Sequence, residues 1–225
     1  ARVNYDYNYR YMVSVVARYY GISKLSDNRW GFFPGISAGW NVHEEAFFKD
    51  SKFAEVVSLI KPRISYGLNG NVNGIGNFDV YGKYGSVGAY NGNLGYLNTG
   101  VVNSKLRWEK SHTFELGLDL GFFNNRVHMI MDYYNRTTSD LLTDVNLPEY
   151  TGFPSFKTNL GTISNRGFEL EAKVNLLTKK DWSWDVTANT SFVKNMVKKL
   201  PFNGNANNRQ GGSRYGIQNP THWFG

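Results

Sequence analysis

The sequence predicts an all-β protein: an antiparallel sheet of about eight strands, of the kind that closes into a transmembrane β-barrel. Three observations predict this fold. Apolar and polar residues alternate along segments of about ten residues, which is the periodicity of a β-strand. Aromatic residues, 16% of the chain, gather at the ends of these segments. The connections between segments alternate between short and long, like the turns and loops at the two ends of an outer-membrane barrel.

The composition narrows the class of protein. The 225 residues carry a formal charge of +7 and include no cysteine. The high aromatic content excludes intrinsic disorder, and the lack of cysteine excludes disulfide scaffolds and Cys-ligated metal sites. No apolar run approaches the roughly 18 residues of a membrane-spanning helix. The mean hydropathy of −0.45 remains compatible with a barrel, whose lumen and loops are polar.

Three strands are predicted in the first third of the chain, at residues 9–19, 31–42 and 60–68. The first has the clearest alternation, because every odd position from Tyr9 to Tyr19 is aromatic or aliphatic. The other two have weaker alternation. All three satisfy the two-residue period of a sheet with one apolar face.

Four stronger strands follow at 113–122, 127–136, 168–174 and 182–192, each with one apolar and one polar face. The residues expected to face lipid are Phe114, Leu116, Leu118, Leu120, Phe168, Leu170, Val174, Trp184 and Val186. Those expected to face the lumen are Glu115, Asp119, Asp132, Glu169, Glu171 and Lys173.

The lengths of the connections predict which end of the sheet lies in the periplasm and which lies outside the cell. Short turns are predicted at 6–8, 123–125 and 178–181, and longer loops at 21–29, 139–161 and from Met196 onward. Outer-membrane barrels place short turns in the periplasm and long loops outside the cell. The connection 43–58 is too long for this rule, and the spacing of Phe53, Val57 and Ile60 predicts that it contains a short helical piece.

Catalytic and cofactor motifs are missing. The four histidines lack metal-site spacing, and no Gly-x-Ser-x-Gly elbow occurs; they are His43, His112, His128 and His222. Glu169 and Glu171 lie roughly 7 Å apart on one strand face, which suits glycoside hydrolysis but is explained more simply by a polar lumen lining. We therefore predict no enzyme, no metal and no cofactor. The positive residues are dispersed, which argues against nucleic acid as a partner.

Five motifs occur in a recognisable order: NRWGFFP at 28–34, RISYG at 63–67, GLDLGFFNNR at 117–126, DYYNR at 132–136 and NRGFE at 165–169. Together they resemble the later barrel strands of the SusC/RagA-type TonB-dependent transporters of Bacteroidetes outer membranes. The resemblance extends over about residues 3–197.

This resemblance implies an outer-membrane location and energised import of large nutrients, either glycan oligosaccharides or peptides. It implies a SusD-like surface lipoprotein as a lid, and the TonB–ExbB–ExbD complex as a partner of an N-terminal part. Barrels of this class have about 22 strands around a plugged lumen. We therefore expect residues 1–225 to be a partial barrel domain without the plug or the TonB box.

The segment 69–105 is the longest expected loop and is rich in Gly, Asn and Tyr, a mixture typical of adaptable binding surfaces. Within it, contact with substrate or lid is expected for Tyr81, Tyr84, Tyr90 and Asn91. Sugar rings stack on aromatic faces, and their hydroxyls need amide partners. The alternative is a solvated loop without a ligand.

Two other folds remain open. One is a complete eight-stranded outer-membrane barrel acting as a porin or adhesin, since eight strands can close. The other is a soluble carbohydrate-binding β-sandwich, whose core would contain the apolar stripe of strand 113–122.

Overall fold

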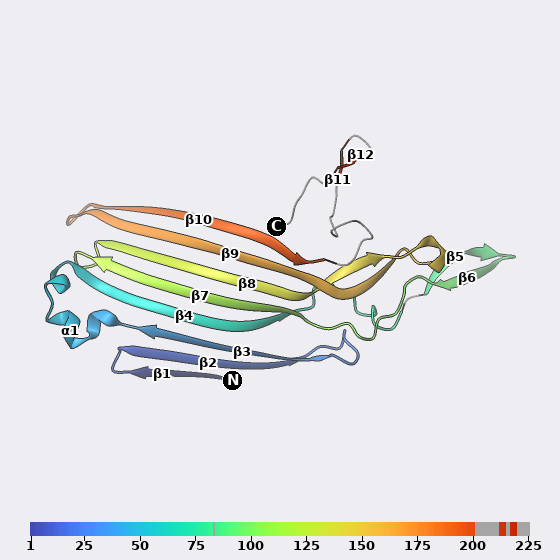
Figure 1. Cartoon of the computed structure of the whole chain (residues 1–225), viewed down its shortest axis with the longest axis horizontal. Helices are drawn as coiled ribbons and strands as arrows, with labels where there is room; N and C mark the ends of the chain where they lie inside the picture. Colours follow the sequence, from blue (N-terminus) through green and yellow to red (C-terminus); the bar gives the residue numbers. More distant parts are fainter. Residues whose placement is uncertain (83, 201–211, 215–216, 220–225) are drawn as a thin grey trace.

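The computed structural model describes residues 1–82, 84–200, 212–214 and 217–219. Eight antiparallel strands form one curved sheet in the order β1-β2-β3-β4-β7-β8-β9-β10 (Figure 1). Their bounds are β1 (Arg2–Tyr7), β2 (Tyr11–Gly21), β3 (Trp30–Trp40), β4 (Val57–Asn71), β7 (Glu109–Phe122), β8 (Val127–Asn146), β9 (Ser155–Thr178) and β10 (Ser183–Lys199). Two small hairpins stand apart from this sheet: β5 (Tyr84–Tyr90) with β6 (Asn93–Asn98), and β11 (Gly212–Arg214) with β12 (Ile217–Asn219).

The register of the sheet confirms the two-residue alternation. Directly paired residues project to the same face of a sheet. One row of paired residues crosses all eight strands and is apolar throughout: Tyr5, Val13, Ala38, Ile64, Leu116, Tyr133, Phe168 and Phe192. The next row projects to the other face: Asp6, Met12, Gly39, Arg63, Gly117, Asp132, Glu169 and Ser191.

The sheet is a single open layer. Large side chains of the apolar row, such as Tyr5, Ile64 and Phe192, are exposed because no second sheet covers them within the part of the chain that the structure describes. The β-sandwich alternative is therefore wrong for these residues. β1 and β10 are the two edges of the sheet, so the described strands do not close on themselves as an eight-stranded barrel would.

The predicted loop at 139–161 is wrong in extent. β8 continues to Asn146 and β9 begins at Ser155, so the connection covers only residues 147–154. The pairing of the two strands shifts register around Leu141 and resumes at Leu142. Beyond this point both strands have polar side chains on both faces, and the alternation that marks a membrane strand is lost although the hydrogen-bonded ladder continues.

The predicted loop at 69–105 is also more ordered than expected. β4 extends to Asn71, and β5 and β6 form a hairpin. The turn of this hairpin is Asn91-Gly92, and both residues have positive φ (48° and 79°). Asn-Gly is the preferred sequence for such two-residue turns.

The opposite end of the sheet carries the short turns, as predicted. The first turn falls at residues 8–10, so Tyr9 lies in a turn with φ 57° rather than in a strand. The long connection between β3 and β4 contains η1 (Val42–Glu44), α1 (Ala46–Lys49) and η2 (Lys52–Glu55), which confirms a helical piece. The spacing that predicts it is wrong, however, because Val57 and Ile60 lie in β4. No helix among the described residues is long and apolar enough to cross a membrane.

Candidate functional site: the polar face and the loop platform

The polar face of the sheet brings the predicted lumen-facing residues together. Asp132 and Glu169 lie in one row, and Asp119 and Glu171 lie in the next row along the strands. Glu115 and Lys173 share this face, because each lies an even number of residues from a member of these rows. All nine predicted lipid-facing residues project to the opposite face. The environments of the two faces, water for one and lipid for the other, stay a prediction.

An arginine from β4 joins two of these carboxylates across three strands. Arg63 donates from Nη2 to Asp119 Oδ1 at 2.8 Å and to Asp132 Oδ1 at 3.1 Å, and from Nε to Asp119 Oδ1 at 3.0 Å. A Cβ atom on Gly117 would lie 2.7 Å from Arg63 Cζ and 2.6 Å from Asp132 Oδ1. Gly117 therefore leaves the space that the guanidinium occupies.

Arg63 was not among the predicted site residues. It lies on the same face and in the same row as Asp132, in a strand whose alternation is weak. The signal that could have found it is charge complementarity: two predicted acidic residues on neighbouring strands need a cation on the same face.

Several hollows lie on this face of the described sheet, and two of them contain the predicted lumen-facing residues in largest number. The first, of about 500 Å³, spans β1 to β8 and is lined by residues that include Ser14, Lys61, Arg63 and Glu115. The second, of about 460 Å³, lies over β8, β9 and β10 and is lined by Asp132, Glu169, Glu171, Asn189 and Ser191, among others. Hydroxyl, amide and carboxylate groups dominate the second hollow. Such a surface offers hydrogen bonds to a polar solute or to a polypeptide.

The loop end of the sheet has a small hydrophobic core, which we call the loop platform. Its buried members are Leu25, Val72, Ile75, Val80 and Leu106, with Ile22, Trp108 and Leu142 packed against them. They come from the β2–β3 loop, from the segments that flank the β5–β6 hairpin, and from the extended part of β8. Sequence reasoning missed this core because its residues follow no regular period.

Side-chain hydrogen bonds to the backbone brace the platform. Asn159 accepts from the backbone N–H of Arg107 at 3.0 Å and donates to the carbonyls of Arg107 (2.9 Å) and Asp140 (2.7 Å). Arg107 Nη2 is 2.7 Å from Asp140 Oδ1, and Lys157 Nζ donates to the carbonyl of Gly74 at 2.7 Å. The extended ends of β8 and β9 are thereby tied to the segments on both sides of the hairpin.

The predicted contact residues all lie on or next to this hairpin, which extends beyond the platform (Figure 1). Tyr81 precedes it, Tyr84 and Tyr90 begin and end β5, and Asn91 is in the turn. Tyr81, Tyr84 and Tyr90 are 61%, 77% and 88% exposed. The residues therefore share one element without converging on one pocket. Tyr96 in β6 is also exposed and was not among the predicted contacts.

A third cluster lies at the turn end of the sheet. Glu45, which is buried, accepts hydrogen bonds from Tyr11 Oη (2.6 Å) and Trp40 Nε1 (3.1 Å), and lies 3.3 Å from Arg10 Nη1. The two hydrogen bonds, together with the charge of Arg10, lower the pKa of Glu45. Tyr7, Tyr11 and Trp40 stack in series, with ring centroids 6.5 and 6.1 Å apart.

Comparison with known proteins identifies the family. Residues 1–222 match the family described as TonB dependent receptor-like, beta-barrel. The chain belongs to this TonB-dependent receptor family. It is 36% identical over 208 residues to the TonB-dependent receptor SusC of Bacteroides thetaiotaomicron, and 38% identical over 204 residues to a TonB-dependent receptor of Formosa agariphila. These two matches cover 88% and 89% of this chain, but only 20% of each relative.

Solved structures agree with this assignment. The chain superposes on the structure of the RagAB peptide transporter with a TM-score of 0.81 and 30% identity, over 89% of its own length and 22% of that chain. The predicted family, the antiparallel barrel fold and the outer-membrane location are confirmed. The chain spans about a fifth of the length of the TonB-dependent receptors that it matches.

Proposed function

We propose that this chain forms eight neighbouring wall strands of an importer that takes up large nutrients across the outer membrane with energy from TonB. The observation that carries the proposal is the two-faced sheet, with an apolar row across all eight strands and an adjacent row that contains Arg63, Asp132 and Glu169. The relatives named SusC and RagAB support import of glycan oligosaccharides or of peptides.

The two faces have different roles in this proposal. The nine predicted lipid-facing residues contact acyl chains, where burial of apolar surface is favourable. The face with Arg63, Asp119 and Asp132 lines the water-filled interior, because ion pairs placed in hydrocarbon would carry a large desolvation cost. The hollows on this face then border either the path of the substrate or a polypeptide that occupies the lumen.

The partners belong to the whole protein. A SusD-like surface lipoprotein covers the loop end, which the RagAB complex supports by analogy. The TonB–ExbB–ExbD complex acts through the part of the importer that contains the plug. The protein has no catalytic role in this scheme, and it needs no cofactor.

The β5–β6 hairpin is the proposed contact for substrate or lid. Its exposed tyrosines provide flat aromatic faces for sugar rings or peptide side chains, and Asn91 provides amide hydrogen bonds. The loop platform holds the base of the hairpin, so ordering of the contact residues costs little entropy on binding.

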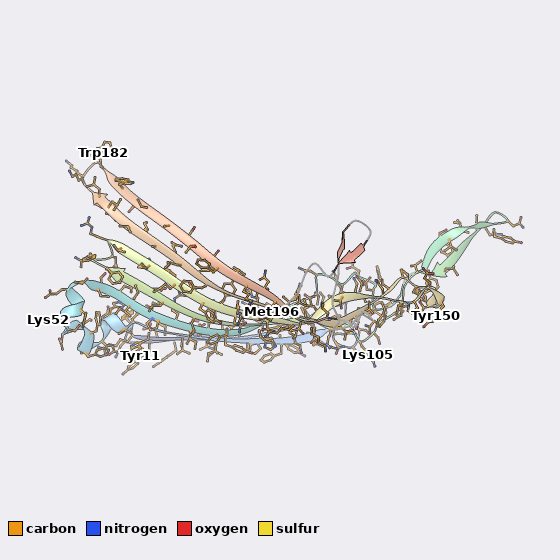
Figure 2. The ribbon with its side chains drawn as sticks, turned by 45° about the horizontal axis from the view of Figure 1, so that its top comes forward. Tyr11, Lys52, Lys105, Tyr150, Trp182 and Met196 are labelled. Carbon is orange, nitrogen blue, oxygen red and sulfur yellow. The ribbon has the colours of Figure 1, made fainter. Side chains whose placement is uncertain are left out.

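The test uses the full-length protein. Replacement of Tyr81, Tyr84 and Tyr90 with alanine should reduce nutrient uptake, or co-purification of the lipoprotein lid, by roughly tenfold or more, as expected for loss of aromatic contact residues. Tyr150→Ala is the matched control, because Tyr150 is an equally exposed tyrosine on the neighbouring loop (Figure 2). Unchanged uptake and lid binding in the triple variant would show that the hairpin is not the contact.

A further inference from the structure

The connection between β3 and β4, residues 42–56, carries aromatic side chains that the rest of the described protein leaves exposed. Phe48 is 9% exposed and packs inward, whereas Phe47 and Phe53 are 64% and 73% exposed. Val56, at the end of the connection, is also exposed. Isolated apolar residues on a surface are common, but this short connection leaves two phenylalanine side chains more than half exposed.

The connection is tied to the apolar side of the sheet. Glu45 is bound by Tyr11 Oη and Trp40 Nε1. Tyr11 lies two residues from Val13 and Trp40 two residues from Ala38, so both rings project to the face of the apolar row. No residue of 42–56 lines any of the three hollows found on the described polar face. The connection that carries Phe47 and Phe53 is therefore tied, through Glu45, to the turn end of the face assigned to lipid.

Charge does not explain the exposure. Lys49 is paired with Glu44 at 2.6 Å, and the connection has more acidic than basic side chains. An acidic or anionic partner is therefore not favoured. Aromatic rings are favourably placed where lipid headgroups meet acyl chains. The stacked rings of Tyr7, Tyr11 and Trp40 already supply such a belt at this end of the sheet.

We propose that residues 42–56 form an interfacial anchor: the Glu45 tie holds the connection against the aromatic belt, and Phe47 and Phe53 insert into the lipid leaflet at the turn end of the sheet. The occupant of this surface is the bilayer itself. The inference rests on the proposed assignment of the apolar face to lipid. Figure 2 shows Lys52 of this connection and Tyr11 of the belt at the same end of the sheet.

The experiment places a fluorophore on the full-length protein in phospholipid vesicles. Single cysteines replace Phe47, Phe53, Leu116 or Tyr150. This chain contributes no cysteine of its own, and cysteines elsewhere in the full-length protein are first replaced with serine. Quenching is measured with lipids that carry a nitroxide near the headgroup, with lipids that carry a nitroxide deep in an acyl chain, and with aqueous iodide. Leu116 reports on the apolar face, and Tyr150 reports on the water-exposed loop end.

Labels at Phe47 and Phe53 should be quenched by the headgroup nitroxide roughly threefold more than the label at Tyr150, and protected from iodide, as expected for rings at the interface. Iodide quenching equal to that at Tyr150 would overturn the anchor. Protection from all three quenchers would also overturn it, because protein would then cover the surface. A label at Leu116 that escapes quenching by the acyl-chain nitroxide would instead refute the face assignment, and with it the proposed barrel orientation.

Discussion

The barrel wall and the loop platform are built on different principles, although one chain forms both. In the wall, each strand pairs with its neighbour, and every second side chain projects from the sheet without covering from protein. In the platform, five apolar side chains from distant segments bury one another, and Asn159 and Lys157 satisfy backbone carbonyls. The wall depends on its surroundings for the burial of its apolar face, whereas the platform supplies its own core.

The largest expected effect tests whether the two regions unfold independently. Leu106→Ala removes a side chain that is almost fully buried in the platform, which should cost about 2–5 kcal/mol. Native-state hydrogen exchange should accelerate at residues 72–80 while protection of β7 is retained. Leu94→Ala, at an exposed leucine of β6, is the control and should change little. Equal acceleration in β7 would show that wall and platform are one cooperative unit.

The next prediction concerns the environment of the wall. Leu116→Arg places a charge in the middle of the apolar row, which should cost about 2–4 kcal/mol if that row lies at mid-membrane. Unfolding of the full-length barrel in detergent or lipid, followed by heat-modifiable gel mobility, measures this. Ser191→Arg places the same charge on the polar face and should have a much smaller effect. Similar losses for both variants would contradict the assignment of the two faces.

The smallest effect concerns the tie between the turn end and the wall. Because the pKa of Glu45 is lowered from 4.5 in the folded protein, its stabilising hydrogen bonds are fully present above pH 4.5 and are lost as the pH falls through the lowered value. A fluorophore at position 47 should therefore report loosening of the connection only in that acidic range. Glu45→Gln should abolish the transition, and Glu44→Gln, which keeps the tie, should retain it. A transition that persists in Glu45→Gln would assign it to another group.

Sequence reasoning predicts the wall well, because a membrane strand must keep a strict two-residue period. The segregation of Glu115, Asp119 and Glu171 from Leu116 and Leu118 follows directly from that period. The predicted strands are too short where the two-residue alternation of apolar and polar residues ends. β8 and β9 continue beyond the register shift at Leu141 with polar residues on both faces, so only the hydrogen-bonded ladder, which leaves no hydropathy pattern, identifies them as strands.

The loop end could be predicted only in part, for a similar reason. The Asn91-Gly92 turn has a local signal, because Asn-Gly is the preferred sequence of two-residue hairpin turns, but the predicted loop at 69–105 does not use it. The core around Leu106 has no local signal, because its members are brought together by the wall beneath them. Glu45 and Arg63 are intermediate cases, since each depends on partners in other strands that become neighbours only once the register is known.

The direct pairing of β4 with β7 has a consequence for how such proteins diversify. The two strands are in unbroken register from Leu59–Gly121 to Asn71–Glu109, and the side-chain amide of Asn71 donates to the carboxylate of Glu109 at 2.7 Å where the strands end. Everything at 72–108 is therefore an insertion between two strands that already fit each other. Evolution can replace or lengthen that segment, and an engineer can transplant it, without changing the pairing of β4 with β7. New specificities can then arise on an unchanged wall.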